Sequence, residues 1–174
     1  MPGIGHLAVG LAAARVTRAP AGLESWRWSL LLAAASFAPD VDVLAFPLGI
    51  PYGATLGHRG ATHSVVFAGL CGCALGLAAR RWNVPALRVA LSVSLVMATH
   101  GILDTFTDGG RGVALLWPFD GERFFAPWRP IPVSPLAWGI FSRRGLNVIS
   151  YECVLFLPLF VIAAWPRRRA EDSV

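Results

Sequence analysis

The sequence predicts an all-α membrane protein, a polytopic bundle of about 4–5 hydrophobic helices with a metal site near one membrane face. Its mean hydropathy is +0.58, and only 14% of its residues are charged, whereas about a quarter are charged in soluble domains. Five hydrophobic stretches of 16 to 23 residues fill most of the 174 residues, which leaves little chain for a soluble module. We therefore expect a single membrane-embedded domain over residues 1–174.

The hydrophobic stretches differ in length and regularity. A transmembrane helix needs about 20 apolar residues, so the first and third stretches are expected to be short, tilted or partly re-entrant helices. Between the last two stretches, residues 108–146 are rich in glycine, proline and aromatic residues. This composition predicts an irregular aromatic loop at the level of the lipid headgroups. The five stretches are 3–19, 28–49, 64–79, 85–107 and 147–165.

The basic residues, all of them arginine, predict the topology. They form three groups after the first, third and fifth stretches: Arg15, Arg18 and Arg27; Arg80, Arg81 and Arg88; and Arg167 to Arg169. If these groups mark cytoplasmic loops, the stretches alternate across the bilayer, and every histidine lies at the extracytoplasmic end. Six other arginines would then also lie outside, which weakens the rule without reversing it. The net charge of +5 therefore reflects topology, and no nucleic-acid partner is expected.

Ionisable residues inside apolar stretches are costly, so they are candidates for function. His100 and Asp104 are four residues apart, share one helix face and can reach a common metal. The alternative is a capping aspartate and a histidine bonded to the backbone. Pro39 disfavours a continuing helix, and an extended segment after it would point Asp40 and Asp42 the same way. Two such carboxylates repel each other unless a cation or proton lies between them, although an aspartate-rich turn at a helix end is also compatible with the pattern.

The motif GHRGATHS contributes two more histidines. His58 is expected in the loop and His63 in the first turn of the helix that follows. Arg59 carries a planar guanidinium that suits a phosphate oxygen. His6 lies alone on an apolar stretch, where a packed histidine is the commoner finding, but the predicted topology puts it on the same face as the others.

Four histidines and at least three aspartates are enough to hold two or three divalent ions. Zinc suits these ligands, with manganese, magnesium or iron as alternatives. Two ions about 3.5–4 Å apart activate a bridging water and neutralise a phosphoryl group, as in phosphoesterases. The spacing of the residues by itself predicts metal binding and no particular reaction.

The motifs GHLAVG, PDVD, HRGATHS, HGILDTFTDGG and LLWPF, in this order over residues 4–120, resemble the YdjM-like (DUF457) family of bacterial membrane proteins. That family is described as inner-membrane metal-dependent hydrolases and is distantly similar to the zinc-dependent phospholipase C and P1-type nuclease superfamily. The resemblance implies an all-α fold in the bacterial cytoplasmic (inner) membrane, and Asp42 as a further ligand or as a partner that orients an imidazole. It implies as metal ligands His6, Asp40, His58, His63, His100 and Asp104.

We therefore expect a membrane-bound phosphoric ester hydrolase that acts on a phospholipid or another lipid-linked phosphate, with membrane lipids as partners. A metal-activated water is the expected nucleophile. Arg59 is expected to orient the substrate or stabilise its charge, and Asp42 or Asp108 to serve as general base. The alternatives are a divalent-metal transporter and a metal-binding membrane protein without hydrolytic activity. A metallopeptidase is disfavoured because the sequence has no HExxH motif.

Overall fold

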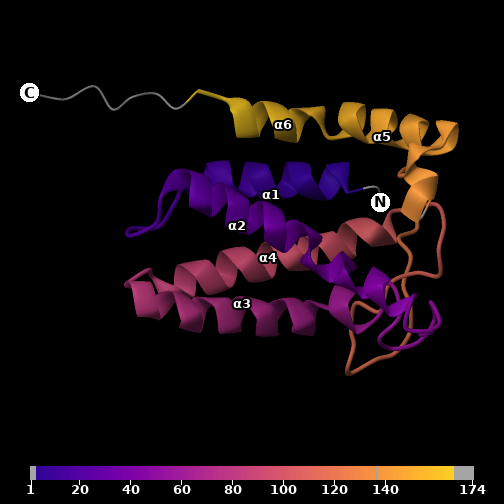
Figure 1. Cartoon of the computed structure of the whole chain (residues 1–174), viewed down its shortest axis with the longest axis horizontal. Helices are drawn as coiled ribbons and strands as arrows, with labels where there is room; N and C mark the ends of the chain where they lie inside the picture. Colours follow the sequence, from indigo (N-terminus) through magenta and orange to yellow (C-terminus); the bar gives the residue numbers. More distant parts are fainter. Residues whose placement is uncertain (1–2, 136, 167–174) are drawn as a thin grey trace, which may run out of the picture.

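This computed structural model describes residues 3–135 and 137–166, and these residues contain six α-helices (Figure 1). These residues contain two isolated β-bridges and no β-strand. The prediction of an all-α protein is therefore confirmed. The helices are α1 (Ile4–Thr17), α2 (Ser25–Phe37), α3 (Val65–Ala79), α4 (Ala86–Thr105), α5 (Arg143–Leu155) and α6 (Leu157–Ala164).

Three helical segments are long and apolar enough to cross a membrane: Ser25–Ala45, Val65–Trp82 and Ala86–Thr105. Helices α5 and α6 form a fourth candidate span, which bends by 59°. Helix α1 is apolar but has only 14 residues, as the short first stretch predicts. The short helix η3 (Arg80–Trp82) extends α3, so the third stretch reaches 18 residues. The predicted number of hydrophobic helices is thus confirmed, with three or four of them able to span the bilayer.

Small residues let the helices pack closely. Helix α3 lies along α4, and α1 lies between α2 and α6 (Figure 1). A Cβ atom added at Gly72 would lie 2.5 Å from the carbonyl oxygen of Ala90, and one at Gly76 would lie 2.6 Å from that of Ala86. Only glycine fits such a close approach of two backbones, which is a common device in membrane helix pairs. The core beneath is apolar and includes Trp28 and Val93.

The two ends of the bundle differ in chemistry. At one end, Arg15 donates hydrogen bonds to the carbonyl of Trp165, and Arg88 donates to the carbonyl of Thr17. The other end holds the start of α1, the 3₁₀-helix η1 (Ala38–Ala45), the start of α3 and the end of α4 (Figure 1). All four histidines lie at this second end, as the ring contacts among them show.

The segment between α4 and α5 is irregular and covers the histidine end. It contains one short 3₁₀-helix, η4 (Ala137–Phe141), and several of its aromatic side chains are exposed, including Phe119 and Trp138. Arg123 holds the segment in place because its guanidinium donates to the carbonyls of His58, Tyr52 and Ala54. The described residues between 108 and 142 contain no α-helix, whereas α5 already begins at Arg143, inside the predicted loop of residues 108–146.

Candidate metal centre

Pro39 breaks the regular α-helix before the site, but the chain does not become extended there. Residues Ala38–Ala45 form a 3₁₀-helix, with proline in its first turn, where its fixed φ angle is compatible and its missing N–H costs nothing. The expectation that Asp40 and Asp42 point the same way is therefore wrong. A 3₁₀-helix has three residues per turn, so side chains two positions apart diverge and enter two different groups.

Asp40, His63, His100 and Asp104 form the first group, which we call the four-ligand site. The Nε2 atom of His63 lies 3.1 Å from Nε2 of His100, 3.5 Å from Oδ1 of Asp40 and 3.5 Å from Oδ2 of Asp104. The Nε2 atom of His100 lies 3.4 Å from the same Asp40 oxygen and 3.9 Å from the same Asp104 oxygen. A zinc ion bound at about 2.0–2.1 Å holds tetrahedral ligands about 3.3–3.4 Å apart. The four atoms thus already have nearly the spacing that zinc requires.

The hydrogen bonds on the far side of each imidazole direct its Nε2 atom into the site. Nδ1 of His100 donates to the carbonyl of Ser36 at 2.7 Å. Nδ1 of His63 lies 3.1 Å from Oδ2 of Asp42. With Nδ1 donating in both rings, the neutral form of each ring presents a lone pair at Nε2, which is the usual arrangement of metal-binding histidines. Two such lone pairs 3.1 Å apart repel unless a metal ion or a proton lies between them.

Asp42 is an outer partner of the imidazoles. Its carboxylate accepts hydrogen bonds from Nδ1 of His58 at 2.7 Å, from the backbone N–H of Arg59 at 3.0 Å and from the hydroxyl of Thr62 at 2.7 Å. Asp42, His58 and His63 have the spacing of a second metal group, but hydrogen bonds already occupy the carboxylate. Of the two alternatives for Asp42, ligand or orienting partner, the geometry favours the partner, and His58 belongs to that network.

Arg59 contacts a ligand of the four-ligand site. Its side chain is 1% exposed, and Nε lies 3.0 Å from Oδ2 of Asp104. The guanidinium also donates to the hydroxyl of Thr107 at 2.7 Å and to the carbonyl of Gly109 at 3.1 Å. The sequence does not reveal this contact of Thr107, because Thr107 lies 48 positions after Arg59 in the chain and meets it only in the folded protein. These contacts give Arg59 a role in holding Asp104, alongside its expected role toward substrate.

His6 lies at the edge of the site. Its ring stacks on that of His100 with centroids 3.6 Å apart, and its Nε2 lies 3.5 Å from Oδ1 of Asp104. Glu152 is fully buried nearby and accepts a hydrogen bond from the backbone N–H of Gly5 at 3.1 Å. It thereby anchors the first turn of α1, which carries His6. Its place at the start of an apolar stretch is compatible with a snorkelling or a hydrogen-bonded residue, and the structure shows the hydrogen bond.

Asp108 lies outside both metal groups. Its side chain accepts a hydrogen bond from the backbone N–H of Val133 at 2.7 Å, and the residue is exposed. The structure therefore ties Asp108 to the loop that follows α4. Its proposed role as a general base has no support in this geometry.

The four-ligand site is open on one side only. The side chain of Asp40 is 27% exposed, whereas those of His63, His100 and Asp104 are at most 1% exposed. Burial lowers the pKa of His63, but the carboxylates of Asp104, Asp40 and Asp42 outweigh burial and raise that pKa to about 10. In the metal-free protein His63 is therefore protonated at neutral pH and partly neutralises the carboxylates.

This protonation makes metal affinity depend on pH. A metal ion must displace the proton of His63, and the raised pKa means that displacement becomes harder as the pH falls below about 10. We expect the dissociation constant for zinc to rise about tenfold for each unit of pH lost between pH 8 and pH 6. Isothermal titration calorimetry in buffers of different ionisation enthalpy measures both the affinity and the released proton. A pH-independent affinity would contradict this assignment of charge.

The comparisons with known proteins place the chain in a family. The model of the family described as YdjM inner membrane protein matches residues 1–169. The chain is also 42% identical, over 136 residues, to the inner membrane protein YbcI of Escherichia coli (strain K12); the match covers 75% of this chain and 79% of the relative. No solved structure matches the chain. The inner-membrane location implied by the sequence agrees with both names, and the chain belongs to the YdjM inner membrane protein family.

Proposed function

We propose that the protein is a membrane-bound metal-dependent hydrolase, a zinc phosphoesterase that acts on a phospholipid or a lipid-linked phosphate. The observation that carries the proposal is the four-ligand site, whose nitrogen and oxygen atoms have nearly the spacing of tetrahedral zinc at the end of a membrane bundle. In the metal-free protein the proton of His63 lies between the two Nε2 atoms, and a bound metal ion would take its place. Manganese or another divalent ion is the alternative cofactor.

The four-ligand site has three buried ligands and one partly exposed ligand, an arrangement that fits a catalytic metal ion. Catalytic zinc ions keep three protein ligands and one open position, and a bound ion there supplies Lewis acidity and lowers the pKa of a coordinated water. His63, His100 and Asp104 supply the fixed set. Asp40, the exposed member, would leave the fourth position to water or substrate and would accept the proton of the attacking water as the bond between phosphorus and the leaving oxygen breaks. That proton then passes to the leaving alcohol.

The two groups of possible metal ligands share His63, which limits how many ions can bind at the same time. The sequence predicts two or three ions, and the two groups of possible ligands overlap at this residue. We assign the catalytic ion to the four-ligand site and assign Asp42 and His58 to the support of His63. Further ions would need ligands that are now hydrogen-bonded to one another.

A metal transporter is the rival function, and it would be expected to carry ionisable residues along a path through the membrane. Helix α3 has no ionisable side chain other than cysteine, and α4 has none between Arg88 and His100. No ionisable side chain of these two spans continues the site toward the arginine end. The hydrolase proposal needs no such path.

We propose that the metal end faces the extracytoplasmic side. Arg15, Arg88 and the other arginines of the first two groups lie at the opposite end of the bundle, and such residues mark cytoplasmic loops. In a variant without native cysteines, we expect Glu122→Cys to react in intact cells with a membrane-impermeant maleimide and Asn83→Cys to stay unlabelled. Labelling at position 83 and not at position 122 would reverse the orientation.

The hydrolase proposal is tested with purified protein in lipid nanodiscs, stripped of metal by a chelator and reloaded with zinc. We expect phosphate or a phosphorylated headgroup to be released from phosphatidic acid or phosphatidylglycerol, as measured by mass spectrometry. The release should stop after chelation, return with zinc and fall to background in His63→Ala. Asp120→Asn serves as the control, because Asp120 belongs to neither metal group and accepts a hydrogen bond from the backbone N–H of Glu122. Protein that holds stoichiometric zinc and cleaves no phosphoester, soluble p-nitrophenyl phosphate included, would refute the proposal.

A further inference from the structure

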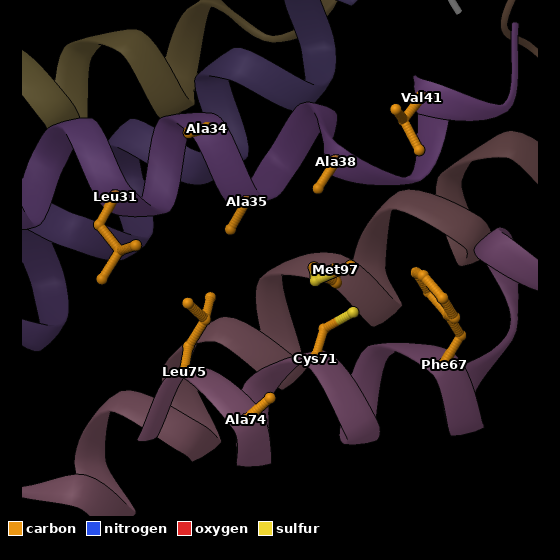
Figure 2. A pocket seen from close by; sticks show the side chains of 10 residues that line it. All are labelled: Leu31, Ala34, Ala35, Ala38, Val41, Phe67, Cys71, Ala74, Leu75 and Met97. Carbon is orange, nitrogen blue, oxygen red and sulfur yellow. The ribbon is translucent and has the colours of Figure 1, made fainter. Parts of the chain in front are cut away.

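An apolar groove runs between α2 and α3. Both helices lean on α4 and leave a hollow of about 520 Å³ between them, with Met97 of α4 at its base (Figure 2). Small side chains make the hollow: Ala35 and Ala38 on one wall and Ala74 on the other (Figure 2). Its volume lies within the range of about 300–1,000 Å³ typical of ligand sites. The groove is part of the described fold and needs no movement to form.

One end of the groove lies against the four-ligand site. Val41, at this end in Figure 2, follows Asp40 directly in the chain. Phe67 lies four residues after His63, and Met97 lies three residues before His100. One helical turn rises about 5.4 Å, so the wall of the groove begins within about one turn of these ligands.

The length of the groove matches one leaflet of a bilayer. Leu31 and Val41 mark its two ends on α2 and η1, and the α-helical and 3₁₀-helical residues between them rise about 17 Å. The hydrocarbon core of a membrane is about 30 Å thick, so half of it is about 15 Å. The walls belong to the three candidate spans, which places the groove at the depth of the lipid chains. A second hollow of about 540 Å³ continues past Leu31 and Leu75 toward Trp82.

We propose that this groove binds the acyl chain of a membrane phospholipid whose phosphate lies at the four-ligand site. The inference rests on the proposed function and adds how the substrate is held. An amphiphile with an anionic head and an apolar tail complements both features at once, because the cationic metal centre is at one end and the apolar groove extends from it into the leaflet. Hydrophobic burial in the groove would keep the phosphate at the open, Asp40 side of the site.

The test uses phosphatidylglycerol with a photoactivatable diazirine in one acyl chain, reconstituted with the zinc-loaded protein. Mass spectrometry of the cross-linked peptides locates the chain. Ala74→Phe fills the groove from an exposed position, so folding is expected to tolerate it. Cys73→Phe is the matched control, because it adds an aromatic ring at the preceding residue of α3, which is exposed and does not line the groove. Zinc content is measured in all three proteins.

We expect label on Leu31–Val41 and Phe67–Leu75 in the wild type and in Cys73→Phe, and about tenfold less in Ala74→Phe, the loss expected when about two methylene groups are kept out of the groove. Turnover of the long-chain lipid should fall in Ala74→Phe, while turnover of soluble p-nitrophenyl phosphate stays unchanged. Label that persists in Ala74→Phe, or spreads evenly over the outer face of α3, would overturn the inference. So would conversion of a dimer to a monomer by Ala74→Phe without any groove label in the wild type, because the groove would then hold a second copy. Groove labelling without any hydrolysis would refute the proposed function and leave the lipid site standing.

Discussion

Asp104→Ala is expected to weaken zinc binding by about two to three orders of magnitude. A complete zinc site contributes about 10–16 kcal/mol, so one of four ligands accounts for about 3–4 kcal/mol. Asp104 is buried within 3.5–3.9 Å of both metal-facing imidazole nitrogens, and no other carboxylate of the described group can replace it from the same side. Equilibrium dialysis with zinc in detergent solution measures the affinity.

Two further variants separate the loss of a ligand from a loss of folding. Asp108→Ala removes an aspartate four residues later that bonds to Val133 outside the site, and it should bind zinc as the wild type does. His100→Ala removes a ligand that has no arginine partner, and it should lose affinity as Asp104→Ala does. Equal zinc affinity in Asp104→Ala and Asp108→Ala would show that the four-ligand site is not where the metal binds.

Arg59→Met is expected to lower the stability of the metal-free protein by about 3–5 kcal/mol, the usual cost of leaving a buried charge without its partner. The substitution keeps an unbranched apolar side chain but removes the guanidinium cation beside Asp104. For a chain of this size the loss corresponds to a fall of about 10 °C in Tm. Thermal unfolding in detergent, followed by circular dichroism, measures it.

Zinc provides the internal control for this variant. Bound zinc supplies the missing cation to Asp104, so the deficit of Arg59→Met should shrink when the protein is loaded with zinc. Arg111→Met removes an exposed arginine from the loop after α4 and should change Tm little. Equal shifts in the two variants, with no effect of zinc, would contradict a role of Arg59 in holding Asp104.

The sequence predicts the helices and most of the site because both follow from the cost of placing polar groups in a membrane. His100 and Asp104 share a helix face, as their spacing of four residues predicts, and the two meet in the four-ligand site. The expected gathering of the histidines at one end is also observed. These features depend on helical periodicity and hydropathy, which are local properties of the chain.

The remainder depends on contacts between distant parts of the chain. Pro39 predicts a break in α2, but whether extended or 3₁₀ backbone follows is decided by packing at the end of the bundle. The link from Glu152 to Gly5 spans 147 positions, and no local pattern reveals it. The groove depends in the same way on the spacing of α2 and α3 over α4. Sequence patterns identify the polar residues that are costly to place in a membrane, whereas the fold determines which of them come into contact.

X-ray absorption spectroscopy of the zinc-loaded protein tests the central claim most directly, because it reports the type and distance of the ligands without requiring activity. The four-ligand site predicts two imidazole nitrogens together with carboxylate or water oxygens at about 2.0–2.1 Å, and no sulfur. A spectrum with sulfur ligands, or with fewer than two imidazoles, would contradict the account. So would a purified protein that retains no stoichiometric zinc after loading.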